Sequence, residues 1–148
     1  MNCQDPPVDV REPWIAEHQD LQLVMSRARD AIVEHCLSPG EIGALVTQLL
    51  DRLAAHFRNE EQGGYFDEVM AAAPRFHARV DLLVRQHCFL KELLESLRRR
   101  VNAGARSQAS WLEAQAIFER FLRNFQEHEA AETKLLQEAY TDDLGQGD

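Results

Sequence analysis

The chain has 148 residues, of which 45% are apolar, and this composition is typical of one folded globular domain. Its 16 Lys and Arg are outnumbered by 25 Asp and Glu, which gives a formal charge of −9. So acidic a surface repels nucleic-acid phosphates and anionic lipid heads, and the basic run at residues 98–100 is short. We therefore expect no nucleic acid and no membrane among its partners.

The three cysteines, Cys3, Cys36 and Cys88, do not pair evenly and form no CxxC motif. The first residues lack the basic and apolar segments of a secretory signal, and no stretch approaches the roughly 20 apolar residues of a membrane span. These features predict reduced thiols and a cytoplasmic location.

The first two predicted helices cover residues 13–36 and 39–62. Pro13 suits the first turn of a helix, because its fixed φ and its missing N–H are tolerated there. Ser38 and Glu41 have the spacing of a capping box, which predicts the start of the second helix. Two consecutive glycines after residue 62 predict its end.

The third and fourth predicted helices cover residues 74–102 and about 107–140. Pro74 suits the start of the third helix, and either Ser107 or Ser110 caps the fourth. The short connections make the first and second helices, and the third and fourth, antiparallel neighbours. The predicted fold is therefore all-α, an up-down-up-down antiparallel four-helix bundle.

We expect the bundle to form one domain over residues 13–140, between an N-terminal arm at 1–12 and an acidic tail at 141–148. Each predicted helix has an inward stripe of apolar residues spaced three and four apart. The stripes are interrupted at six positions, namely His18, His56, Glu60, His87, His128 and Glu132. Buried polar groups cost free energy without partners, so these six either satisfy one another or surround a ligand.

The four interrupting histidines, one from each helix, are predicted to lie at one depth. They are about 17–22 residues from the turns at one end of the bundle, a spread of roughly 7 Å at ~1.5 Å per residue. Glu60 and Glu132 each follow one of these histidines by four residues, so each shares its face. The two carboxylates are therefore expected together in the next layer.

The remaining two histidines do not fit this layer. His77 is displaced by about 15 Å along the third helix and turned by about 80° from His87, so His87 is preferred. This choice requires the third helix to extend beyond its neighbours, with residues 65–73 packed beneath the extra turns. His35 lies at the opposite end, where it is expected to interact with the helix dipole.

Four imidazoles and two carboxylates are a donor set that suits a metal ion. Zinc takes about four ligands in a tetrahedron, whereas six ligands with carboxylates able to bridge suit two octahedral iron or manganese ions. Ferritin-like di-iron bundles use Glu-x-x-His motifs. This chain instead has His-x-x-x-Glu twice, at residues 56–60 and 128–132, which favours a histidine-rich di-iron site.

Four motifs resemble those of bacterial hemerythrin-like proteins, the HHE cation-binding family, over about residues 14–140. They are Glu17-His18, HFRNEEQGGYF from His56 to Phe66, RQHCFLKELL around His87, and QEHEAAETKLLQEAY around His128. The resemblance implies a non-haem di-iron centre in a four-helix bundle that binds dioxygen or responds to it. It also implies the ligand set: His18, His56, His87 and His128 as terminal ligands, and Glu60 and Glu132 as bridging carboxylates.

One position departs from the dioxygen-carrying hemerythrins, which have a His-x-x-x-His pair on the third helix. Here the residues four before and four after His87 are Leu83 and Lys91. This implies an open or water-filled position, or a replacement donor such as Glu61, which is otherwise a solvated helix-end carboxylate. An open ferrous position favours redox chemistry or sensing over reversible oxygen carriage. Cys88 is interpreted as a buried thiol and not as a ligand.

These observations favour a metal-binding protein with two non-haem iron ions, bridged by oxo or hydroxo, over one with manganese or zinc. The expected function is to bind or sense O₂, peroxide or NO, and a signal would require a protein partner or a homodimer. One alternative is an enzyme, a small di-iron oxidase or peroxidase. Another is a metal-free helical interaction module whose core histidines are hydrogen-bonded.

Overall fold

The computed structural model describes residues 11–34, 37–104 and 107–145, with the backbone alone described at 11–14 and 142–145. All regular elements in these ranges are helical, which confirms the predicted all-α class. The long helices are α1 (Arg11–Glu34), α2 (Pro39–Gln62), α4 (His77–Asn102) and α5 (Gln108–Gly145). Between them lie the short helix α3 (Tyr65–Ala72) and a 3₁₀ turn (Pro74–Phe76). No helix in the described ranges is long and apolar enough to cross a membrane.

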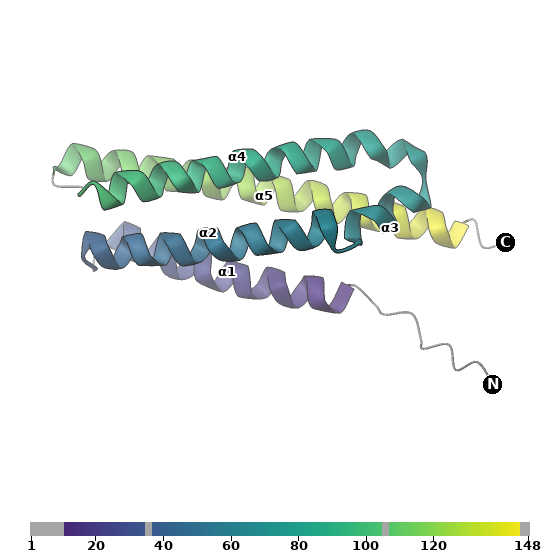
Figure 1. The fold of residues 1–148 in the computed structure, drawn as a ribbon, viewed down its shortest axis with the longest axis horizontal. Coiled ribbons are helices and arrows are strands. Elements are labelled where there is room, and N and C mark those ends of the chain that lie inside the picture. Colours follow the sequence, from purple (N-terminus) through teal and green to yellow (C-terminus); the bar gives the residue numbers. More distant parts are fainter. Residues whose placement is uncertain (1–10, 35–36, 105–106, 146–148) are drawn as a thin grey trace.

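The four long helices form the predicted antiparallel bundle (Figure 1). Helix α1 packs against α2, α2 against α4, and α4 against α5, while α5 contacts α1 more sparsely. The α1–α2 and α4–α5 connections lie at one end, on the left of Figure 1. The α2–α4 connection, which contains α3, lies at the other end beside the C-terminal turns of α5.

The helix starts follow the local sequence. The Ser38 hydroxyl accepts from the Glu41 N–H at 3.2 Å and the Glu41 carboxylate accepts from the Ser38 N–H at 2.8 Å, which confirms the capping box. Of the two serines open for α5, Ser107 has the capping position, because its hydroxyl accepts from the Ser110 N–H at 3.1 Å. Helix α2 ends at Gln62, as predicted.

The predicted helix bounds are wrong at four places. Helix α1 begins at Arg11, two residues before the predicted start, and its predicted end at residue 36 lies outside the described residues. Residues 65–72 form α3, a helix that the sequence analysis did not expect, and Gly64 begins it with φ +95°, a conformation open to glycine. The residues after Pro74 form a 3₁₀ turn, so α4 begins at His77. Helix α5 continues past residue 140 to Gly145, because no helix-breaking residue precedes that glycine.

The buried apolar residues form two clusters. The turn-end cluster, at the α1–α2 and α4–α5 connections, joins side chains from 21–32 of α1, 42–57 of α2, 90–101 of α4 and 111–125 of α5. The α3-end cluster consists of Tyr65, Phe66, Val69, Ala73, Phe76, Val80, Leu83, Leu135 and Ala139. Residues 65–73 therefore pack against the extra turns of α4, as expected from the choice of His87.

Candidate metal centre

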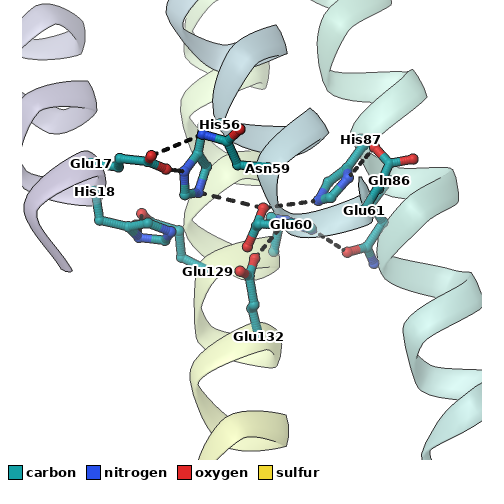
Figure 2. Close-up of polar contacts among 11 residues, drawn as sticks. Glu17, His18, His56, Asn59, Glu60, Glu61, Gln86, His87, Glu129 and Glu132 are labelled. Atoms are coloured by element: carbon teal, nitrogen blue, oxygen red, sulfur yellow. Dashed lines mark hydrogen bonds and ion pairs between the residues drawn. The ribbon is translucent and has the colours of Figure 1, made fainter. Parts of the chain in front are cut away.

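Six polar side chains lie between the two apolar clusters along the helices. Figure 2 labels five of them, His18, His56, Glu60, His87 and Glu132. The six are His18 of α1, His56 and Glu60 of α2, His87 of α4, and His128 and Glu132 of α5. All are buried except His18, whose side chain is 12% exposed. The residues that interrupt the predicted inward stripes thus come together in one layer across the bundle.

The six side chains form two overlapping groups. Ligand atoms of His18, His56, Glu60 and Glu132 lie within 4.8 Å of one another, and so do those of Glu60, His87, His128 and Glu132. We call the first group the α1–α2 position and the second the α4–α5 position, after the helices that supply the histidines. Each position has two imidazoles, and both share the two carboxylates. Shared carboxylates are suited to bridge two cations.

The inward-facing nitrogen atoms approach these carboxylates closely. The Nε2 atoms of His56 and His87 both lie 3.4 Å from Glu60 Oε1, and His128 Nε2 lies 3.0 Å from Glu132 Oε2. None of these three nitrogens makes a hydrogen bond in the described part of the chain. A buried polar atom without such a bond costs about 1–3 kcal/mol. A cation between these nitrogens and the carboxylates would give each nitrogen a partner, so the residues fit a metal ion.

The outward-facing Nδ1 atoms of the four histidines contact a second set of polar residues. The contacts are His56 to Glu17 at 2.8 Å, His87 to Glu61 at 3.1 Å, His128 to Gln86 at 2.8 Å and His18 to Glu129 at 2.8 Å. We call Glu17, Glu61, Gln86 and Glu129 the outer ring, because each helix contributes one acceptor to the histidine of the next helix around the bundle.

The outer ring determines which nitrogen of the histidine rings carries the hydrogen. Carboxylate oxygens accept hydrogen bonds and cannot donate them when ionised, so Nδ1 of His56 and of His87 must carry the hydrogen. Each Nε2 then keeps its lone pair, directed into the layer, which is the form that ligates metals. Burial, together with a smaller effect of the neighbouring histidines, lowers the pKa of His128 to about 3, so this ring is neutral near pH 7.

Aromatic side chains enclose the buried histidines. The ring of Phe57, from the turn-end cluster, stacks on His87 with centroids 3.7 Å apart and planes at 7°. Phe66, from the α3-end cluster, stacks on the same imidazole at 5.8 Å. Tyr65 lies nearby in α3, where burial and the Glu60 carboxylate raise the pKa of its phenol. These rings restrict the orientation of His87 and exclude water from it.

Other candidate residues lie outside the two metal-facing groups. Glu61, the candidate additional ligand, contributes no atom to either group and contacts the outer nitrogen of His87. His77 is exposed at the first residue of α4, and His35 lies outside the described residues. The prediction that Cys88 is buried is wrong. It is exposed, because adjacent helical residues point about 100° apart and His87 points inward.

Sequence reasoning missed the outer ring as a set. A usable signal was present: each member is adjacent in sequence to a residue of the inner layer, as Glu17 is to His18 and Gln86 is to His87. Such a neighbour is turned by about 100° around its helix, toward the adjoining helix. Which histidine it meets depends on the register of two helices, and the sequence alone does not give that register.

The fold and the site define a class of protein, a four-helix bundle with buried histidines and carboxylates in two overlapping groups, each of which could hold a cation. The sequence matches the family model for the hemerythrin HHE cation binding domain over residues 9–140. This match covers most of the chain, so the chain belongs to that family. No curated protein and no solved structure matches it. The family and the buried cluster together indicate cation binding.

Proposed function

We propose that the chain is a non-haem di-iron protein that binds or senses dioxygen or a related species, such as peroxide or NO. The observation that carries the proposal is the pair of overlapping groups, each with two imidazoles and two shared carboxylates. Nitrogen and oxygen donors without a thiolate suit iron or manganese, and the family match supports cation binding. The proposed ligands are His18, His56, Glu60, His87, His128 and Glu132.

The number of donors supports a role with a small molecule. Each position offers four protein side chains, whereas an octahedral ion takes about six ligands. The remaining positions are open to solvent or to a small exogenous molecule. Iron held in this way supplies a redox-active centre. In this proposal Glu60 and Glu132 hold both ions, the outer ring fixes the imidazoles, and Phe57 with Phe66 excludes water around His87.

Metal analysis and absorption spectroscopy test the proposal on the full chain. We expect about two irons per chain after purification without chelators. The oxidised protein should show charge-transfer bands of a bridged ferric pair that change when azide is added. Less than about 0.3 metal per chain after supply of ferrous ion would reject the di-iron function and favour the metal-free interaction module.

A pair of substitutions on α4 tests the ligand assignment. His87→Ala removes a fully buried imidazole of the α4–α5 position, so we expect it to lose bound metal. His77→Ala is the matched control, because it changes an exposed histidine of the same helix outside the layer. It should bind metal like the unsubstituted chain. Loss of metal from His77→Ala alone would overturn the assignment.

A second candidate function is a small di-iron oxidase or peroxidase. It is favoured by the same open positions and by the partial exposure of His18, whose side chain is 12% exposed whereas the other five proposed ligands are buried. Steady-state consumption of hydrogen peroxide with a reducing dye separates the two functions. Turnover that is lost in His87→Ala and kept in His77→Ala would favour the enzyme, and binding without turnover would favour the sensor.

A further inference from the structure

The outer ring contains one neutral member. Glu17, Glu61 and Glu129 are carboxylates, whereas Gln86 is an amide. The geometry at Gln86 is equivalent to that at Glu17, since each holds the Nδ1 atom of a buried histidine with an oxygen at 2.8 Å. The four contacts form a closed circuit around the bundle, so the difference at residue 86 is one of charge and not of hydrogen bonding.

This difference divides the ring unequally between the two positions. The histidines of the α1–α2 position, His18 and His56, both contact carboxylates. At the α4–α5 position His87 contacts a carboxylate, whereas His128 contacts the amide of Gln86. A carboxylate on Nδ1 makes the imidazole a more basic ligand and adds a negative charge near the cation. An amide oxygen orients the ring without adding charge.

We propose that Gln86 is a positioning residue that weakens cation binding at the α4–α5 position and makes an iron there easier to reduce. The inference depends on the proposed function, because it requires two bound cations. One fewer negative charge near a buried centre favours the ferrous over the ferric form. Gln86, the neutral member of the outer ring, contacts His128 of the α4–α5 position. On α4, the residue one turn before His87 is Leu83 and not a second histidine. The α4–α5 position therefore combines one fewer negative charge in the outer ring with the absence of a second histidine on α4.

Substitution of Gln86 separates charge from hydrogen bonding. Gln86→Glu keeps an acceptor of the same length and adds charge, whereas Gln86→Leu removes the acceptor. Outer partners of metal-ligating histidines change metal affinity by about 10- to 100-fold. We expect Gln86→Glu to bind the weaker of two ferrous ions about 10- to 100-fold more tightly and Gln86→Leu to bind it less tightly. A purely structural role predicts that neither variant binds more tightly than the unsubstituted chain.

The mirror variant is Glu17→Gln, which neutralises the equivalent partner of His56. It should weaken the α1–α2 position and leave the α4–α5 position unchanged. The loss should be smaller than the gain from Gln86→Glu, because Glu17 is 39% exposed and solvent screens its charge. The double variant should reverse the order of the two affinities.

The experiment is an anaerobic competition of the full chain with a chromogenic ferrous chelator, followed by a redox titration of the iron-loaded variants. Opposite shifts for Gln86→Glu and Gln86→Leu, with a lower reduction potential in Gln86→Glu, support the proposal. Two bound irons whose affinities and potentials do not respond to Gln86→Glu overturn it and leave the di-iron function standing. A chain that binds no ferrous ion overturns both.

Discussion

The two apolar clusters differ in how they are enclosed. The turn-end cluster is surrounded by all four long helices. Among the side chains that the structure describes, the α3-end cluster receives none from α1, and it is closed by a two-turn helix, a 3₁₀ turn and the polar layer. Regular helices bury a continuous stripe without help, whereas a short helix depends on what it contacts. We therefore expect the turn-end cluster to be stable without metal and the α3-end cluster to depend on it.

The largest predicted effect tests the independence of the turn-end cluster. Phe121→Ala removes a fully buried ring that stacks between Phe118 and Phe125 at 6.0 and 5.8 Å. The substitution should lower the free energy of unfolding by about 3–5 kcal/mol. Urea unfolding should show the same loss with and without metal, and metal stoichiometry should not change. A loss confined to the metal-loaded protein would contradict the comparison.

Metal removal tests the other half of the comparison. The proposed ligands tie α2, α4 and α5 together next to the α3-end cluster, so chelation should loosen that end first. At free metal about 1,000-fold above the dissociation constant, the lost stabilisation is about 4 kcal/mol. Hydrogen exchange should show reduced protection in α3 and in the first turns of α4, with residues 42–53 of α2 as the internal control. Equal loss along all helices would show that the two ends are not independent.

The difference between long helices and a short helix that depends on its contacts also explains which parts of the fold could be predicted. The four long helices were predictable because apolar spacing, the Ser38 cap and the glycine breaks are local properties of the sequence. Helix α3 was not, because two turns are marginal without the contacts of Tyr65 and Phe66. The end of α5 was also missed, since the polar residues after Tyr140 contain no helix-breaking residue before Gly145.

In the candidate site, the six inward-facing residues could be predicted from the sequence, whereas the outer ring could not. Phase and depth along single helices were sufficient to bring together the six inner residues, because each property is read from one helix at a time. The outer ring requires the rotation of one helix against the next. Glu61 illustrates the difference: its position on α2 was clear, but its contact with His87 of α4 depends on both helices. Contacts between helices were therefore the part that the sequence did not predict.

Substitution of one glycine at each end of the bundle tests the comparison with a smaller expected effect. Gly64 has φ +95° and no atom within 4 Å of the position of an added Cβ, so Gly64→Ala has a conformational cost alone, of about 1–2 kcal/mol. Gly40, in the first turn of α2, is the matched control, and Gly40→Ala should stabilise the protein slightly. Thermal unfolding measures both. Metal removal should reduce the effect of Gly64→Ala, because a loosened α3 imposes φ +95° on residue 64 less strictly, and should leave that of Gly40→Ala unchanged.

The smallest predicted effect concerns the pH dependence of the turn end. The backbone N–H of Ser38 donates to the Glu41 carboxylate, and this bond lowers the pKa of Glu41 below its ordinary value of 4.5. A carboxylate with a lowered pKa in the folded state stabilises the protein above its ordinary pKa. That contribution disappears as the pH falls through the folded value. The effect is small because solvent screens the charge of the fully exposed Glu41 side chain.

Glu41→Gln keeps an acceptor at the capping position but does not titrate. The unsubstituted chain should therefore be the more stable of the two at pH 6, and the difference should vanish as the pH is lowered below 4.5. Urea unfolding across this range measures the difference. Because Ser38 and Glu41 lie at the end remote from the polar layer, the profile should be identical with and without metal. A metal-dependent profile would mean that the cation stabilises the turn end as well, and that the bundle responds to its ligand as one unit.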